Sequence, residues 1–184
     1  MKIGWYILCY HNISWEENPY IRGIGGTCPP DIFRDHIVHL YEVGECVSIS
    51  EGLSRLRGGN INNPIFSFWF DDGLSGPRKY ALPLLKQHNT TAAFSICSRF
   101  VDRSEFFWLF KLSYLSYVDG LRFLRGRLRK YGYEHGKSVK TFCIANFSES
   151  IVQEIDSVFR EFTSEAERQD AFRLFETDSG LLEL

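Results

Sequence analysis

The sequence lacks an apolar run of the roughly 18 residues that a helix needs to cross a bilayer. It also lacks an excess of positive charge, since its formal net charge is −2, which argues against a protein that holds nucleic acid by bulk charge. The five cysteines are odd in number, scattered along the chain and without C-x-x-C spacing, so neither a disulfide framework nor a structural zinc site is indicated. We expect free, buried thiols at all five cysteines, Cys9, Cys28, Cys46, Cys97 and Cys143.

The N-terminus shows no features of an export signal. It carries a single lysine, its apolar run is interrupted by His11 and Asn12, and no small-residue cleavage site follows. Residues 5–10 are therefore predicted to form a buried first strand, and the protein is predicted to be cytoplasmic.

The rest of the composition is that of an ordinary globular protein. With 184 residues, 44% of them hydrophobic and 24% charged, the chain is long enough for one domain or two small ones. In the first hundred residues short apolar runs alternate with amphipathic segments, which predicts an α/β fold with parallel strands. The predicted strands are residues 5–10, 46–49, 65–70 and 91–97, and the predicted helices start near Asp31, Ser50 and Pro77.

The pattern changes after residue 100. Residues 105–133 are helical in character with a break at Gly120, and two acidic helices are predicted within 149–175. We therefore divide the chain into an α/β part, residues 1–100, and a helical part, residues 101–184.

Charge is unevenly distributed within the helical part. Residues 99–140 carry ten Lys or Arg and four Asp or Glu, whereas residues 148–184 carry three and ten. The two segments could pair with each other or present separate solvated faces. Separate faces are favoured, because exposed ion pairs contribute little individually.

The residues that point to chemistry follow the apolar strand 65–70. Asp71 and Asp72 are adjacent at its carboxyl end, the end at which catalytic groups collect in barrels of parallel strands. Two neighbouring carboxylates repel each other and need a cation or a proton to coexist. One of them could bind a metal while the other acts as a base. Asp-Gly is also a favoured turn dipeptide, so a plain turn at Asp72-Gly73 is the alternative.

The stretch Phe70-Asp71-Asp72-Gly73 resembles the first motif, T-F-D-D-G, of the polysaccharide deacetylases, carbohydrate esterase family 4. The resemblance extends over about residues 5–100, with its parts in the family's order. These further parts are Tyr10-His11 and the segments 33–40, 47–49, 51–53, 81–85 and 90–96.

The resemblance implies a distorted, TIM-barrel-like (β/α) barrel, here incomplete and followed by a helical insertion or extension. It also implies a hydrolase that removes an N-acyl group from an amino sugar or polysaccharide with the help of a divalent metal ion, expected to be zinc. By position, Asp71 matches the general base of the family and Asp72 its metal ligand. His11, at the end of the first strand, is a candidate substrate-binding residue.

The sequence also departs from the family. The family completes its metal site with a second motif, His-Ser/Thr-x-x-His, and this sequence has none, since only His88 and His135 follow the Asp pair. His36 and His39 could share a helix face, but they precede the motif and are interpreted as surface or half-buried residues. Trp69 stands where the family usually has Thr, which would crowd the end of the strand.

Two explanations account for the missing motif: a truncated chain or a degenerate relative. Truncation is favoured, and because an open half-barrel has unpaired strand edges, a second copy or a partner chain is expected to complete it. The rival function is a catalytically inactive module that binds a glycan or a partner. A third candidate function is that of a membrane-surface adaptor, which would use the basic, aromatic segment 105–130. No nucleic-acid partner is expected.

Overall fold

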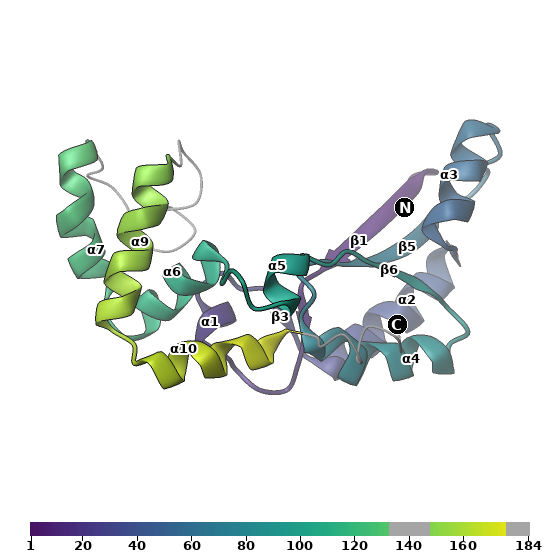
Figure 1. Ribbon diagram of the computed structural model, residues 1–184. Helices are drawn as coiled ribbons and strands as arrows, with labels where there is room; N and C mark the ends of the chain where they lie inside the picture. The colour runs from purple at the N-terminus through teal and green to yellow at the C-terminus, as the bar shows by residue number, and fades with distance from the viewer. Residues whose placement is uncertain (133–147, 176–184) are drawn as a thin grey trace. The chain divides into compact units, whose positions relative to one another are not determined.

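The computed structural model of the chain describes residues 1–132 and 148–175 (Figure 1). These residues form two compact units, and the chain enters each of them more than once. The first, called the sheet unit, comprises Met1–Trp15, Thr27–Val101 and, at the end of the described chain, Leu174 and Phe175. The second, called the helical unit, comprises the described residues of Glu16–Gly26 and Asp102–Arg173.

Parallel strands form the sheet unit, as the sequence predicts. Strand β1 (Trp5–Tyr10) pairs with β5 (Ile65–Phe70) along its whole length. Strand β4 (Glu45–Cys46) pairs with the start of β5 and β6 (Ala92–Phe94) with its end, so both lie along the other edge of β5. The α/β class is confirmed. No closed barrel occurs within the described ranges, and the barrel geometry stays a prediction.

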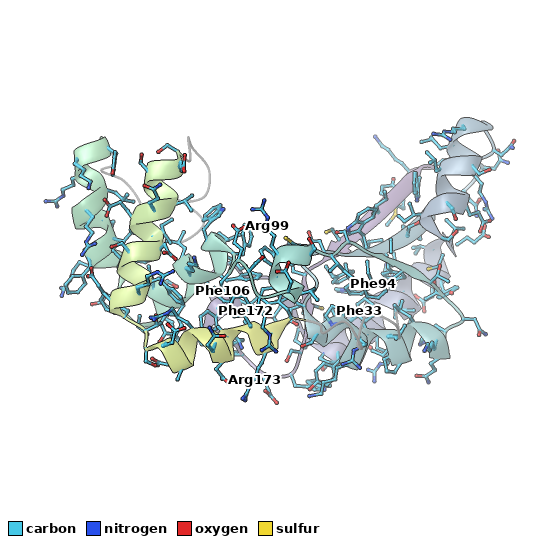
Figure 2. The ribbon with its side chains drawn as sticks, viewed as in Figure 1. Phe33, Phe94, Arg99, Phe106, Phe172 and Arg173 are labelled. Atoms are coloured by element: carbon cyan, nitrogen blue, oxygen red, sulfur yellow. The ribbon has the colours of Figure 1, made fainter. Side chains whose placement is uncertain are left out.

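One face of the sheet carries an aromatic core. Successive side chains of a strand point to opposite faces, and Phe66, Phe68 and Phe70 of β5 are all buried on the same one. Helix α2 (Pro30–Val43) covers them through Phe33 (Figure 2). The Phe33 ring lies 5.6 Å from Phe68 and 5.7 Å from Phe70 between centroids. Both ring pairs are T-shaped, a favourable aromatic geometry.

The helices of the sheet unit begin and end at the predicted signals. α2 ends at Gly44, where an added Cβ would lie only 2.3 Å from the Pro64 carbonyl oxygen. α3 (Ile49–Arg57) begins after Ser48, whose hydroxyl accepts a hydrogen bond from the Glu51 amide. The predicted helix from Pro77 is also present. It consists of a π-helical turn, η1 (Pro77–Ala81), which continues as α4 (Leu82–Gln87), and a short helix follows β6, α5 (Ser98–Val101).

Two predicted strands are too long. The strand expected at 46–49 ends at Cys46, because Ser48 caps α3 and Ile49 is already helical. The strand expected at 91–97 is reduced to the three residues of β6.

A small second sheet was not predicted. Strand β2 (Asn12–Ile13) pairs in parallel with β3 (Thr27–Cys28), and the chain between them forms helix α1 (Pro19–Arg22). The side chain of Asn18 caps α1 by accepting from the Tyr20 amide. Such short elements lack the length over which hydrophobic periodicity can be recognised.

The helical unit contains the predicted helices, with the break at Gly120. α6 (Trp108–Tyr117) and α7 (Leu121–Leu128) lie on either side of it in the chain. The later helices are α9 (Glu149–Glu161) and α10 (Glu165–Ala171), and two 3-10 turns, η2 (Arg129–Tyr131) and η3 (Phe172–Leu174), follow α7 and α10. Helix α9 packs against both α6 and α7 (Figure 1). None of the described helices has the length and apolar character needed to span a membrane.

The basic and acidic segments of the helical unit pair with each other, so the preference for separate solvated faces is wrong. Lys111 of α6 lies 2.6 Å from the Asp156 carboxylate of α9, and Lys130 lies 2.5 Å from Glu154. Arg127 of α7 also contacts Glu161. Packing of α9 against α6 and α7 brings these charges within reach of each other, which composition alone does not show.

The prediction of free thiols is confirmed for the four described cysteines, but their predicted burial is wrong. Cys9 is exposed, and the other three, Cys28, Cys46 and Cys97, are half-buried. Cys143 lies outside the described residues.

Candidate metal centre

Two strand ends bring three polar side chains together. His11 directly follows β1 and Asp71 directly follows β5. Because Tyr10 lies opposite Phe70 in this parallel pair, the register places His11 beside Asp71. The Asp71 amide extends the ladder by donating to the Tyr10 carbonyl oxygen at 3.3 Å. Functional groups collect at such carboxyl ends of parallel strands.

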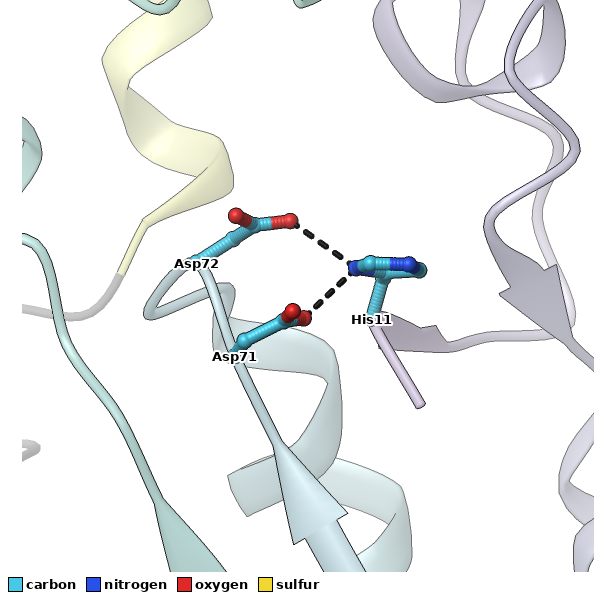
Figure 3. A group of neighbouring side chains, drawn as sticks. All are labelled: His11, Asp71 and Asp72. Atoms are coloured by element: carbon cyan, nitrogen blue, oxygen red, sulfur yellow. Dashed lines mark hydrogen bonds and ion pairs between the residues drawn. The ribbon is translucent and has the colours of Figure 1, made fainter. Parts of the chain in front are cut away.

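The chain turns sharply just after the strand. Asp72 has φ 66° and Gly73 has φ 70°, both in the left-handed region. Glycine adopts this region freely, whereas another residue costs about 1 kcal/mol or more there, and Asp is among the most tolerant types. A turn is therefore present, as the alternative interpretation predicts. It also directs Asp72 toward the same point as Asp71, as Figure 3 shows.

Both carboxylates face one nitrogen of the His11 ring. His11 Nδ1 lies 2.5 Å from Asp71 Oδ1 and 3.1 Å from Asp72 Oδ2 (Figure 3). The side chains are partly exposed, 45% for His11, 30% for Asp71 and 20% for Asp72, so a small ligand can reach them. We call these three residues the His–Asp–Asp cluster.

The cluster favours a positive charge at its centre. The hydrogen bond with Asp72 raises the pKa of His11, burial opposes this, and the negative charges of Asp71 and Asp72 add to the rise. The net pKa of His11 lies above its usual value. A protonated imidazole and a bound cation are two ways to meet the same requirement.

Cys9 is a fourth residue at this place. Its thiol donates to Asp71 Oδ2 at 3.6 Å, so it holds the oxygen that does not face His11. Burial raises the pKa of the Cys9 thiol, and the charge of Asp71 raises it further, which keeps the thiol protonated as a donor. The sequence analysis did not single out Cys9. Cys9 precedes Tyr10 in β1 and lies opposite Trp69 of β5, so knowledge that these two strands pair would have located it near Asp71.

The donor set of the cluster suits a divalent metal ion. One ligand atom from each of His11, Asp71 and Asp72 lies within 4.8 Å of the others. Asp71 Oδ1 is buried, and its close partner is His11 Nδ1 at 2.5 Å, without the geometry of a good hydrogen bond. A buried carboxylate oxygen needs a cation beside it, which is either the protonated imidazole or a metal ion. Imidazole and carboxylate ligands are those that zinc uses in open sites.

The other histidines do not join the cluster. His36 Nδ1 lies 2.8 Å from the hydroxyl of Tyr10, and His39 pairs with Glu42 on the surface of α2. His88 follows α4, and His135 lies outside the described residues. Within the described chain, no second pair of histidines replaces the missing family motif near the cluster.

Trp69 does not block the end of the strand. Its indole N–H donates to Ser95 Oγ at 3.2 Å, so the side chain is held by the segment after β6. The crowding expected at this position therefore does not keep His11 from the two carboxylates.

Comparisons with known proteins find similarity to solved structures alone. No protein-family model and no curated protein matches this chain. Several solved structures are similar to it, among them three deacetylases. The deacetylase PplD of Streptococcus pyogenes is 21% identical, with a TM-score of 0.47 over 56% of this chain and 46% of that one. A de-N-acetylase from Aggregatibacter actinomycetemcomitans is 24% identical, with a TM-score of 0.43 over 53% and 39%.

The third is BC0361, a polysaccharide deacetylase from Bacillus cereus, at 18% identity and a TM-score of 0.41 over 85% and 56%. The chain spans between 39% and 56% of the length of these three structures. The chain is therefore similar to a part of each of these solved structures.

Proposed function

We propose that this chain is a metal-dependent polysaccharide or amino-sugar deacetylase, which hydrolyses the carbon–nitrogen bond of an N-acyl group on a carbohydrate. The observation that supports this is the convergence of His11, Asp71 and Asp72 at the ends of β1 and β5, where one ligand atom from each lies within 4.8 Å of the others. A plain turn at Asp72-Gly73 does not by itself account for an imidazole that faces both carboxylates.

Each residue of the cluster has a proposed role. Asp72 and His11 would hold the ion, since His11 Nδ1 and Asp72 Oδ2 are 3.1 Å apart. Asp71 is the general base, and Cys9 fixes the orientation of its carboxylate through Oδ2. Zinc is the expected metal, because the ligands are a nitrogen and carboxylate oxygens.

The proposed reaction is an acyl transfer to water. A divalent ion in this cluster supplies Lewis acidity toward the acyl group and lowers the pKa of bound water. Asp71 takes a proton from the attacking water while the water oxygen forms a bond to the acyl carbon. The carbon–nitrogen bond then breaks, and Asp71 returns the proton to the leaving nitrogen. The products are a carboxylic acid and a free amine on the sugar.

The role predicted for His11 from the sequence, a contact to the substrate, is the alternative to a metal ligand. The two roles differ in what His11→Ala changes. Loss of a ligand weakens metal binding, whereas loss of a substrate contact raises KM and leaves the metal affinity intact.

Calorimetric titration of the full chain with Zn²⁺ tests the proposal. We expect binding that Asp72→Ala abolishes and that Asp35→Ala, at an exposed site on α2, leaves unchanged. Asp71→Asn should keep the metal but lower the deacetylation rate of an N-acetylglucosamine tetramer by about 10²- to 10⁴-fold, the usual contribution of a general base. A folded chain that binds no Zn²⁺ contradicts the proposal and favours the inactive glycan- or partner-binding module.

The helical unit is proposed to be an insertion or extension of the deacetylase fold. Three further predictions stay predictions. They are that a second copy or a partner chain completes the site, that the protein is cytoplasmic, and that residues 105–130 contact a membrane surface. α7 keeps Phe123 56% exposed beside Arg122, which is what that last prediction requires. Light scattering of the purified chain and sedimentation with anionic vesicles test assembly and membrane contact separately.

A further inference from the structure

A cleft outside the His–Asp–Asp cluster lies wholly within the helical unit. It has a volume of about 550 Å³ and is bounded by the segment before α6, by α9 and by α10. Clefts of this size hold small molecules or single units of a polymer. Nothing in the proposed deacetylase chemistry uses it.

Phenylalanine rings form the floor of the cleft. Phe106 and Phe159 are stacked with centroids 6.0 Å apart and an interplanar angle of 13°. Phe172 meets Phe106 edge-on at 5.4 Å, and Figure 2 shows the two side by side. Phe106 and Phe159 are buried, whereas Phe172 is half-buried and offers its surface to the cleft. The floor can therefore receive an apolar face of a ligand.

Most charged groups at the rim already neutralise one another. Asp156 is paired with Lys111 at 2.6 Å and with Arg160 at 2.8 Å. Arg168 donates to Glu165 at 2.7 Å. These pairs therefore offer a charged ligand no free charge of opposite sign. The two charged groups of the rim that have no partner among the described residues, Arg103 and Glu149, have opposite signs. The rim therefore favours an uncharged ligand.

Three other rim residues have no partner among the described residues. They are Arg103, Glu149 and Gln153, all of them exposed at the cleft. Arg103 can only donate, Glu149 can only accept, and the Gln153 amide can do both. A ligand that suits them must offer donors and acceptors together while remaining neutral.

We propose that this cleft binds an uncharged sugar residue of a glycan chain. Sugar hydroxyls donate and accept, and the C–H face of a sugar ring is the apolar surface that the phenylalanine floor requires. The inference deepens the proposed function, because it takes the carbohydrate class from it and adds a binding subsite on the helical unit. It does not depend on the metal.

Two-dimensional NMR of the full chain, titrated with an N-acetylglucosamine tetramer, tests the subsite. We expect shift changes at Gln153 and Phe172, and Gln153→Ala should weaken this binding about tenfold, the effect of roughly one or two lost hydrogen bonds. Gln87→Ala, on α4 of the sheet unit, is the matched control and should change nothing. Shifts that leave the cleft unaffected, or equal affinities of the Gln153 and Gln87 variants, overturn the subsite.

The ligand class and the metal site are tested separately. A fully deacetylated, cationic glucosamine tetramer and an anionic galacturonic acid tetramer should both bind the cleft more weakly than the neutral tetramer. Tighter binding of either one overturns the neutral-sugar assignment. Asp72→Ala should leave the cleft shifts intact, so that failure of the deacetylase proposal and failure of the subsite are distinguishable.

Discussion

At the residue scale, the space left by one glycine determines how the segment after His11 is held. An added Cβ at Gly76 would lie 2.1 Å from Asn12 Oδ1 and 2.5 Å from the Ile13 carbonyl oxygen. Asn12 and Ile13 are buried and directly follow His11. Close approach at Gly76 therefore fixes the backbone on which the imidazole of the cluster depends.

Gly76→Ala is expected to destabilise the fold by about 1–3 kcal/mol, the usual cost of overpacking. It should also weaken Zn²⁺ binding, because the segment after His11 must shift. Gly126→Ala in α7 is the control, since an added Cβ there meets nothing within 4 Å. That control should stabilise by up to about 1 kcal/mol through helix propensity. Urea unfolding of both variants checks the prediction, and equal changes would show that crowding is not the cause.

At this scale the sequence predicts all three residues of the cluster as candidates, with His11 as a contact to the substrate, but it does not predict that His11 faces both carboxylates. Asp71 and Asp72 stand out because two carboxylates directly follow an apolar strand. The convergence of His11 with them could not be predicted, because it depends on β1 lying next to β5. Those strands are far apart in the sequence, and apolar runs predict that strands exist without predicting which ones are neighbours.

At the scale of elements, one buried hydroxyl fastens α1 to α6. Ser113 Oγ accepts from the Gly23 amide at 2.8 Å and donates to the Pro19 carbonyl oxygen at 2.8 Å. Ser113 is completely buried. A helix as short as α1 cannot be stable by itself, so its position depends on contacts of this kind.

Ser113→Ala should lower the free energy of unfolding by about 1–3 kcal/mol, since it leaves the half-buried Gly23 amide and Pro19 carbonyl without their partner. Ser116→Ala on the same helix is the matched control. Its hydroxyl only donates back to the Ser113 carbonyl oxygen within α6, so its loss should matter little. Thermal unfolding of the two variants is the measurement, and a Ser116 effect as large as that of Ser113 would contradict this account.

Long elements were predictable and short ones were not. The helices of the helical unit carry many apolar residues at helical spacing, and Gly120 marks the break between two of them. α1, β2 and β3 carry no such pattern, and their geometry comes from caps and from tertiary contacts such as that of Ser113. The excess length predicted for two strands has a similar origin, since propensity does not reveal where a neighbouring strand ends.

At the scale of the whole molecule, ion pairs connect segments that are distant in the sequence. Asp156 of α9 joins Lys111 of α6, whose side chain is only 14% exposed. Burial raises the pKa of Asp156, but hydrogen bonds from Lys111 and Arg160 outweigh burial and hold that pKa below its usual value. The folded state therefore favours the charged carboxylate, and this linkage gives stability a dependence on pH.

Asp156→Asn is expected to destabilise the chain by about 1–2 kcal/mol at neutral pH, because Lys111 keeps its charge in a half-buried place. A lowered carboxyl pKa stabilises above the unfolded value of about 3.9. That stabilisation is lost as the pH falls through the folded value. The difference in the free energy of unfolding between the unmodified chain and the Asp156→Asn variant should thus shrink below about pH 4. Urea unfolding at several pH values measures it, and Asp170→Asn, in an exposed pair with Arg173, should show almost no difference at any pH.

The helical unit is built from two separate stretches of the chain, Glu16–Gly26 and Asp102–Arg173, and this has a consequence for synthesis on the ribosome. Tyr20 of α1 stacks on Tyr114 and meets Phe159 edge-on. The ribosome makes Tyr20 first and Phe159 much later, on the order of ten seconds at ordinary rates of translation. During that interval the nascent chain carries an apolar turn whose partners do not yet exist. The helical unit can therefore close only after α9 has been made, although its first residues are made well before.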